Sequence, residues 1–432
     1  MTTGSDDPSA TDASVPGPGR ARGFSRRGLI AGGAGAAAGA AVGAGVTAAL
    51  TGRTRGGAEG ADDSVDLSRS VPFYDQLHPA GVRTPPQRHC VYMTFTLNPS
   101  ATRQDLQVLL ARWSAAIAQL MQGKSIGTVE PQRPDAVPAD TGEVTGLEPA
   151  SLTVTVGLGP GVFGNRFGLA ERRPALLEPL PRIPGDTLRP EFTGGDLSLQ
   201  ACADDPQVAY HAIRNLARMV TATAHTHWVV MGFGRASAGP GQETPRNLMG
   251  FKDGTRNVVS DADYDRFVWL KDADWMTGGT YQVARKIAMT IETWDFDRIS
   301  DQQQIFGRTK VEGAPLTGER EFDTPDFTRR VEDAYVIDQT SHIALAAPEN
   351  NDGLKILRRS YNYTDGLNPQ GLLDAGLLFL SYQNDPANFV ALQNKLGRFD
   401  LLNEYIRHIG SAVFAVPPAP VTGSYIGKDL FA

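Results

Sequence analysis

Cysteine is scarce in this sequence. The 432-residue chain contains only Cys90 and Cys202, which are far apart and form no Cys-x-x-Cys motif. Zinc sites and iron–sulfur clusters ligated by cysteine need several such residues, so they are excluded. Both cysteines lie in apolar, strand-like sequence, and we therefore expect two buried free thiols.

An excess of positive charge is also missing. The chain has 41 Lys and Arg against 48 Asp and Glu, which gives a formal net charge of −7. No basic stripe follows the N-terminal segment, so we expect no nucleic-acid partner. A composition of 41% hydrophobic and 21% charged residues is typical of a globular protein. The length predicts two domains.

A strongly apolar membrane span is not found either. The uncharged run Ala31–Leu50 consists mainly of Gly and Ala, which makes a poor transmembrane anchor. It follows the pair Arg26-Arg27 in Ser25–Ile30, a twin-arginine pattern. We therefore expect residues 1–61 to be an export signal and linker, with an uncleaved anchor as the alternative. The mature protein would then be extracellular, in the cell envelope or periplasmic, without a stable membrane anchor.

The hydrophobic pattern of residues 62–245 predicts one domain with six main elements. Its two helices, one of them capped by Thr102 with Asp105 three places later, show apolar residues at helical spacing. Its strands alternate or are continuously apolar. The expected order is strand Cys90–Leu97, helix Thr102–Gln122, strand Ser151–Val156, strand Leu197–Cys202, helix Pro206–Ala224 and strand Trp228–Phe233.

Residues 246–432 repeat this order and form the second expected domain. The elements are strand Tyr281–Trp294, helix Arg298–Phe306, strand Lys355–Tyr363, strand Gly376–Tyr382, helix Pro386–Asn403 and strand Ile409–Val416. A β-α-β-β-α-β order is that of the ferredoxin-like unit. The sequence thus predicts an α+β protein of tandem ferredoxin-like repeats, with two antiparallel sheets packed together and helices outside.

The segment Asn247–Asn257 is a candidate functional loop. Gly250 and Gly254 permit a positive φ and a close approach of the backbone to a flat ligand, and they flank the carboxylate of Asp253. An ordinary Asp-Gly surface turn is the alternative.

A histidine and an arginine pair are the other candidates. His342 precedes the uncharged stretch Ile343–Pro348, and Arg358-Arg359 lie within an expected strand. Alternation places one of these arginines on a buried face, where it needs an anionic partner or ligand. A structural ion pair is the alternative. His225 and His227 share a strand face, but without a carboxylate at matching spacing they do not predict a metal site.

Four blocks in this order resemble the dye-decolourising peroxidase family: Gly250-Phe-Lys-Asp-Gly254, His342, Arg358-Arg-Ser-Tyr-Asn-Tyr363 and Gly371-Leu-Leu-Asp-Ala-Gly-Leu-Leu-Phe379. The resemblance covers roughly residues 85–420. It is strongest to the exported, twin-arginine branch that includes the deferrochelatases.

The resemblance implies one haem b per chain, held in the C-terminal half with His342 as the iron ligand. Asp253 and Arg358 would be the catalytic groups that act on H₂O₂. The backbone at Gly254 would approach the haem.

Two further cofactor contacts are inferred from placement. Asp374, a lone carboxylate in an apolar run, is expected to accept a hydrogen bond from His342. Arg359 is expected to meet a haem propionate.

The implied activity is a peroxidase that uses H₂O₂ to oxidise bulky organic donors such as dyes and phenols through an oxoferryl intermediate. Aromatic side chains of the second half are candidates for electron relay, although most are expected to belong to the core. They are Tyr335, Tyr363, Tyr382, Trp269, Trp275 and Trp294.

Three other functions stay open. One is deferrochelatase activity, the release of iron from haem, which iron-free porphyrin would reveal. A second is a non-enzymatic exported haem-binding protein, and a third is a chlorite-degrading relative, against which Asp253 argues. A homo-oligomer also stays open.

Overall fold

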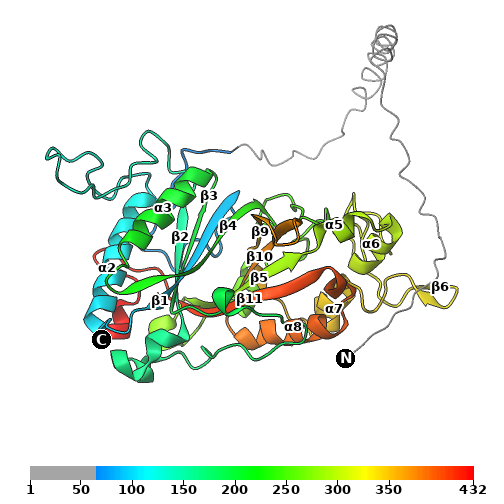
Figure 1. Ribbon diagram of the computed structural model, residues 1–432. Coiled ribbons are helices and arrows are strands. Elements are labelled where there is room, and N and C mark those ends of the chain that lie inside the picture. The colour runs from blue at the N-terminus through cyan, green and yellow to red at the C-terminus, as the bar shows by residue number, and fades with distance from the viewer. Residues whose placement is uncertain (1–64) are drawn as a thin grey trace, which may run out of the picture. The chain divides into compact units, whose positions relative to one another are not determined.

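The computed structural model describes residues 65–432, and its first strands and helices follow the predicted order (Figure 1). The first half contains β1 (His89–Leu97), α2 (Arg103–Leu120), β2 (Thr153–Leu158), β3 (Leu197–Ala203), α3 (Pro206–Arg218) and β4 (Ala224–Arg235). The predicted signal, with Arg26 and Arg27, lies outside the described residues.

Helix α2 shows why the local sequence suffices for such an element. The Thr102 side chain accepts a hydrogen bond from the Asp105 amide, and the Asp105 carboxylate accepts one from the Thr102 amide. This capping box satisfies donors at the helix start and confirms the predicted cap. The helix buries the apolar stripe that its spacing predicts, namely Leu106, Leu109, Leu110, Trp113, Ile117 and Leu120.

The second half contains more short elements than the sequence predicts. It comprises α4 (Asp261–Phe267), β5 (Thr280–Met289), α5 (Ile291–Asp295), α6 (Ile299–Phe306), β6 (Arg330–Val331), β7 (Ala334–Tyr335), α7 (His342–Ala346), β8 (Leu357–Arg358), β9 (Tyr361–Leu367), β10 (Leu373–Gln383), α8 (Pro386–Phe399) and β11 (Ile406–Val416). No helix in residues 65–432 is long and apolar enough to cross a membrane.

Two of the predicted strands differ from the structure. The strand expected at Tyr281–Trp294 ends at Met289, and the apolar residues that follow form α5, because a short apolar run fits either structure. The strand expected at Lys355–Tyr363 is divided into β8 and β9. The break lies at Arg359 and Ser360, directly after Arg358.

Nine of the eleven described strands form one antiparallel sheet in the order β5-β11-β2-β3-β1-β4-β9-β10-β8, and β6 pairs with β7 in a separate hairpin. The prediction of two separate sheets is therefore wrong in this respect. The two halves are joined where β4 pairs with β9 and β11 with β2, so the edge groups of one half hydrogen-bond those of the other. An additional pairing of β5 with β10 closes eight strands into a ring.

The ring separates two kinds of buried side chain. On β1, Val91 and Phe95 belong to the core beneath α2 and α3, whereas Cys90 and Tyr92 point to the opposite face and belong to an inner cluster. This inner cluster contains side chains from both halves: Cys90, Tyr92, Cys202, Trp228, Val230, Ala284, Tyr361, Tyr363, Leu378, Leu380, Ala412 and Phe414. The helices α2 and α3 lie beside the first half and α7 and α8 beside the second (Figure 1).

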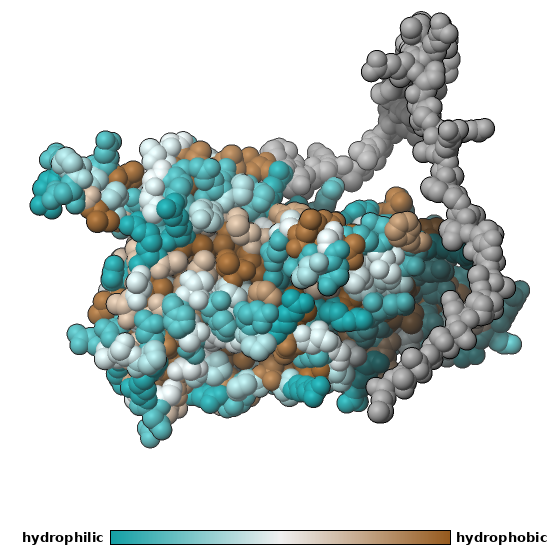
Figure 2. All heavy atoms as spheres, in the orientation of Figure 1, coloured by the Kyte–Doolittle hydropathy of each residue, from teal (hydrophilic) through white to brown (hydrophobic). Residues whose placement is uncertain are grey.

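One stripe of the outer face of the sheet stays exposed. Val229, Met231 and Phe233 alternate along β4 and are 42%, 51% and 38% exposed. Figure 2 shows hydrophobic side chains gathered over the region that β4 occupies in Figure 1. The neighbouring β1 is covered by α3 on this face, so the helical layer ends between the two strands.

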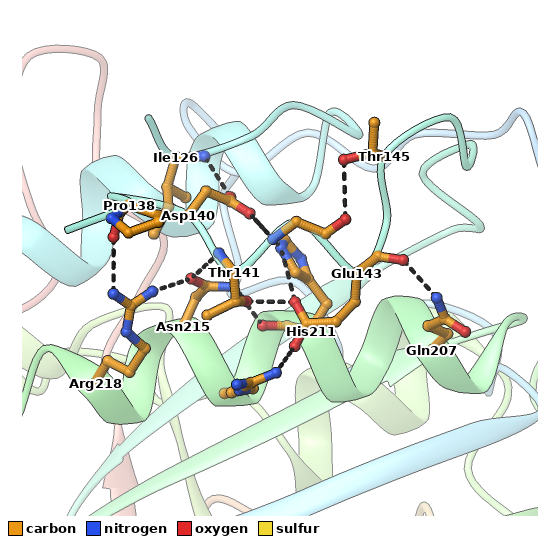
Figure 3. A network of polar contacts seen from close by, with 12 residues as sticks. Ile126, Pro138, Asp140, Thr141, Glu143, Thr145, Gln207, His211, Asn215 and Arg218 are labelled. Carbon is orange, nitrogen blue, oxygen red and sulfur yellow. Dashed lines mark hydrogen bonds and ion pairs between the residues drawn. The ribbon is translucent and has the colours of Figure 1, made fainter. Parts of the chain in front are cut away.

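A buried polar network holds the long loop after α2 against α3 (Figure 3). His211 on α3 lies 2.8 Å from an Asp140 carboxylate oxygen, and both side chains are almost completely buried. The same carboxylate accepts hydrogen bonds from the amides of Ile126 and Gly142. His211 is therefore structural.

Candidate active site

The loop that carries Asp253 is held in shape by its own side chains. The Asn247 carboxamide oxygen accepts hydrogen bonds from the Met249 and Phe251 amides, and its Nδ2 donates to Asp253 Oδ2 at 3.2 Å. Phe251 is buried and stacks on Phe306 at a centroid distance of 4.1 Å. The loop is thus an ordered platform for one carboxylate.

Gly254 is required by packing within the protein. Its φ is +109°, and a Cβ at this position would lie 2.9 Å from the Ala238 amide nitrogen and 3.0 Å from Ser237 Cα. Any other residue would collide with that backbone. Gly254 also lines the cavity described below.

Arg358 lies beside Asp253 in the wall of the cavity described below. Its Nη1 donates to Asp253 Oδ1 at 2.6 Å, and the two side chains are 26% and 16% exposed. The Arg358 backbone is clamped by Asn257, which accepts from the Arg358 amide and donates to the Arg358 carbonyl, both at 2.8 Å. The clamp places the guanidinium beside the carboxylate, although 105 residues separate them.

His342 is the first residue of α7, and its ring is oriented by Asp400. The ring Nδ1 lies 2.7 Å from Asp400 Oδ2, while Asp400 Oδ1 accepts the Leu402 amide at 2.9 Å. Asp400 joins the end of α8 to the following turn and is buried. With Nδ1 engaged, Nε2 is the nitrogen that is free to bind a metal.

One cavity brings these groups together. The space that the centres of water molecules can occupy in it is about 220 Å³. The cavity is lined by Asp253, Arg358, His342 and Asp400. Apolar side chains form much of the remaining wall: Ile287, Met289, Phe306, Leu377, Phe379, Leu392, Leu396, Leu402 and Ile406. A largely apolar cavity with a few convergent polar groups is typical of a ligand site.

The environment of His342 favours its charged form. Burial lowers the pKa of His342, but the charge and hydrogen bond of Asp400, together with the charge of Asp253, outweigh burial and raise the pKa above its ordinary value. A strongly basic imidazole is also a strong electron donor to a bound metal.

A second cationic group lies in the cavity wall. Arg308 is buried and donates to the carbonyls of Gly313 and Glu321, and no carboxylate in residues 65–432 forms an ion pair with its guanidinium. Burial, together with the charges of Arg256 and Arg358, outweighs the charge of Glu321 and lowers the pKa of Arg308 to about 10. Such a cation suits an anionic group of a ligand.

The structure corrects two of the sequence-based assignments. Asp374 does not line the cavity; its charge acts on Tyr363, and the acceptor for His342 is Asp400. Arg359 does not line the cavity either. It points into the ring, toward Cys202 and Tyr361, and donates to the Thr84 carbonyl and the Gln87 side chain.

The sequence analysis missed Asp400, Asn257 and Arg308. Asp400 lies inside the expected helix Pro386–Asn403, whereas α8 ends at Phe399, so its role as a turn-capping carboxylate was hidden. Asn257 belongs to the predicted loop, and a carboxamide three residues after the Asp-Gly pair was its only signal. Nothing in the local sequence distinguishes Arg308 from other arginines.

The arrangement can bind a metal through Nε2 of His342. The Asp253–Arg358 pair can take part in the proton transfer and charge stabilisation that a reaction with peroxide needs. A carboxylate next to a fixed guanidinium can accept a proton while the cation stabilises developing negative charge. Among residues 65–432 no group of three His, Cys, Asp or Glu side chains forms a direct metal-ligand cluster.

Comparison with known families agrees with this site. Family models described as Dyp-type peroxidase match residues 79–234 (the N-terminal model) and 244–421 (the C-terminal model). The chain belongs to the Dyp-type peroxidase family, whose members are haem-dependent enzymes.

Individual relatives span most of the chain. It is 38% identical over 344 residues to a dye-decolorizing peroxidase of Thermobifida fusca, covering 77% of each chain. It is 36% identical over 372 residues to the deferrochelatase of Escherichia coli K12, covering 83% of this chain and 86% of that one. Among solved structures, the oxyferrous complex of DtpA from Streptomyces lividans has a TM-score of 0.78 and 37% identity, covering 84% of this chain and 98% of that one.

Proposed function

We propose that this protein is a haem b peroxidase that uses H₂O₂ to oxidise bulky organic donors such as dyes and phenols. The observation that carries this proposal is the shared cavity, which is lined by the His342–Asp400 pair and by the Asp253–Arg358 pair. The first pair suits an iron ligand and the second suits peroxide chemistry.

The residues present fit haem b. The apolar walls suit a flat macrocycle, His342 offers one ring nitrogen, and Arg308 offers a buried cation for a propionate. The buried His408 Nδ1, also in the cavity wall, has no hydrogen-bond partner among the described residues and is a further polar group for the ligand. We therefore place the haem in the C-terminal half. The strand orders β2-β3-β1-β4 and β11-β5-β10-β9 support two ferredoxin-like repeats.

The roles of the surrounding residues follow from their contacts. Haem b, when bound, supplies the iron at which peroxide reacts and the electrons that cleave its O–O bond. Asp253 accepts the proton of peroxide and returns it to the leaving oxygen, and Arg358 stabilises the negative charge on that oxygen. Asn247 and Asn257 hold these two side chains in place.

Asp400 acts on the other side of the cavity. Its carboxylate accepts the Nδ1–H of His342, which fixes the tautomer, so Nε2 would be the nitrogen that binds the haem iron. The negative charge also makes the imidazole a better donor, which favours the ferric state.

Donors larger than this cavity must deliver electrons at the protein surface. Of the six aromatic candidates, Tyr335 is 38% exposed and the other five are buried. Tyr335 therefore supports a surface site for donors better than the others do.

We also propose export through the twin-arginine route. Arg26-Arg27 followed by an uncharged Gly- and Ala-rich run supports this route, which carries proteins already folded around a cofactor.

Deferrochelatase activity is the second candidate function. A relative with 36% identity over 83% of this chain carries that name. Incubation with haem followed by extraction separates the two activities, because only a deferrochelatase yields iron-free porphyrin.

An optical titration tests the main proposal. The purified protein should show a Soret band at about one haem per chain, and one equivalent of H₂O₂ should change the spectrum until a dye or phenol restores it. A haem-loaded protein whose spectrum does not respond to H₂O₂ would contradict the proposal.

A further inference from the structure

Cys90 and Cys202 face each other directly inside the ring of strands. They are Cα partners in the antiparallel pairing of β1 and β3, and both belong to the inner cluster. Both are free thiols, 1% and 0% exposed. Directly opposed residues have Cα atoms about 4.5–5.5 Å apart. A disulfide needs about 4.4–6.8 Å. The two sulfurs can therefore be joined without a change in strand register.

A buried cation lies next to this pair without a carboxylate. Arg359 is 1% exposed, and no Asp or Glu in the described part of the chain forms an ion pair with it. Its two terminal nitrogens donate to Thr84 and Gln87, but its Nε has no hydrogen-bond partner. A buried guanidinium is costly unless a negative charge balances it.

The titratable groups that act on Arg359 are thiols and phenols. Its charge interacts with Cys202 and Cys90 and with the hydroxyls of Tyr361 and Tyr382, and Tyr92 adds a further hydroxyl near Cys90. The Tyr361 hydroxyl also lacks a hydrogen-bond partner. Two unsatisfied donors thus lie around a thiol that can ionise.

We propose that Cys90 and Cys202 are a peroxide-sensitive dithiol, in which the Cys202 thiolate is the counter-ion of Arg359 and H₂O₂ converts the pair to a cross-strand disulfide. This site is separate from the haem cavity, because neither cysteine nor Arg359 lines it. Peroxide is the suitable oxidant for a buried pair, since it is uncharged and little larger than water.

The two sulfurs have different roles. Burial raises the pKa of Cys202, but the hydrogen bond from Cys90 and the charge of Arg359 outweigh burial and lower the pKa below its usual range. Burial, together with Cys202, raises the pKa of Cys90, so Cys90 keeps its proton. Cys202 is therefore the nucleophile and Cys90 the resolving thiol.

The reaction is balanced by one peroxide. The Cys202 thiolate attacks H₂O₂, an S–O bond forms as the O–O bond breaks, and the departing hydroxide takes up a proton to become water. Cys90 then attacks the Cys202 sulfenic acid, the S–S bond forms as the S–O bond breaks, and the released hydroxide leaves as water with the proton of Cys90. The two sulfurs lose two electrons, which reduce H₂O₂ to two waters.

The test is peptide mapping of the full-length, haem-loaded protein after exposure to H₂O₂. The protein is denatured in an alkylating reagent and digested without reductant. We expect a peptide pair joined through Cys90 and Cys202 that is absent without H₂O₂. Two alkylated cysteines after peroxide treatment would overturn the proposal.

Single variants separate the two sulfurs. Cys90→Ser should stop at a sulfenic acid on Cys202, which dimedone labels, and Cys202→Ser should leave Cys90 reduced. If dimedone labels Cys90 in Cys202→Ser as strongly as it labels Cys202 in Cys90→Ser, the assignment of Cys202 as the nucleophile is overturned. His342→Ala tests independence from haem, since the disulfide should form there as well; its absence would overturn direct oxidation.

Arg359 variants test the counter-ion. Without the charge of Arg359 the pKa of Cys202 should rise, so the thiolate fraction at pH 7 falls and oxidation should slow about ten-fold in Arg359→Met. Arg359→Lys keeps the charge and should restore most of the rate. Equal rates in the parent and Arg359→Met would contradict the ion pair. A pH titration of the thiolate absorbance in the unmodified protein also reports the ionisation of Cys202. If Cys202 does not ionise below the ordinary pKa range of a thiol, the ion pair with Arg359 is contradicted.

Discussion

Asp400 Oδ2 lies 2.7 Å from Nδ1 of His342, and this contact joins the end of α8 to the start of α7 across 58 residues. The carboxylate is itself fixed by the Leu402 amide. The ring of His342 is therefore oriented by a group that cannot easily turn away. The orientation of the proposed iron ligand depends on this pair.

Asp400→Asn should weaken the donor character of His342. Loss of the negative charge should raise the reduction potential of the haem iron and slow the reaction with H₂O₂ by about 10–100-fold. A redox titration and stopped-flow mixing with H₂O₂ measure the two effects. Asp374→Asn is the matched control, because Asp374 lies outside the cavity and should leave both quantities unchanged. Equal effects of the two variants would contradict the role of Asp400.

His342→Ala should lose most of its haem, because it removes the proposed iron ligand. His408 lines the same cavity, so a His408 variant tests whether any histidine of the cavity wall is needed for haem binding. Burial and the charge of Arg285 together lower the pKa of His408 to about 3, so its ring is neutral at working pH and can also bind a metal. We expect His408→Asn to retain the Soret band. The opposite pattern in the two absorption spectra would move the iron ligand to His408.

Asp253 and Arg358 should differ in the pH dependence of their variants. Arg358→Leu withdraws a permanent charge and should slow the reaction with H₂O₂ by about 10²–10³-fold at every pH. Asp253→Ala removes a proton carrier and should cost roughly 10²–10⁴-fold, with a loss that changes with pH because water or buffer partly replaces the carboxylate. Stopped-flow spectra from pH 4 to 8 distinguish the two. Parental rates in both variants would mean that neither residue is catalytic.

Asp140 should contribute stability that depends on pH. Burial raises the pKa of Asp140, but hydrogen bonds with His211 and the amides of Gly142 and Ile126 outweigh burial and lower the pKa below its ordinary value. A carboxyl group with a lowered folded-state pKa stabilises the fold above its unfolded pKa of about 3.9 and loses this contribution as pH falls through the folded pKa.

Asp140→Asn should therefore cost about 1–3 kcal/mol near pH 6. The difference from the parent should shrink below roughly pH 4. Thermal unfolding at the two pH values measures this. The exposed Glu148→Gln is the control and should leave the unfolding temperature unchanged at both. A difference for Asp140→Asn that does not vary with pH would show that the charge of Asp140 plays no part.

The arginine pair of the N-terminal segment should direct export. Replacing Arg26 and Arg27 by lysine should retain the protein in the cytoplasm, folded and loaded with haem, because the twin-arginine route requires both guanidinium groups. Cell fractionation with haem absorbance measures the distribution. Unchanged secretion of the lysine variant would indicate a different export route.

The local sequence was sufficient for most elements of regular structure. The Thr102–Asp105 capping box and the apolar stripe of α2 act within a few residues of each other, so they are visible without a fold. The resemblance of four ordered blocks likewise brought Asp253, His342 and Arg358 forward, and the structure places all three around one cavity.

The tertiary structure decided which groups meet. From the sequence, Asp374 and Asp400 are both carboxylates in the second half, and only the packing of α8 against α7 brings Asp400 to His342. The pairing of β4 with β9 and the closure of β5 on β10 likewise depend on edges that are far apart in the chain. The direction of Arg359, into the ring and toward Cys202, follows from that closure. Contacts of this kind depend on distances through space, which hydrophobic periodicity along the chain does not contain.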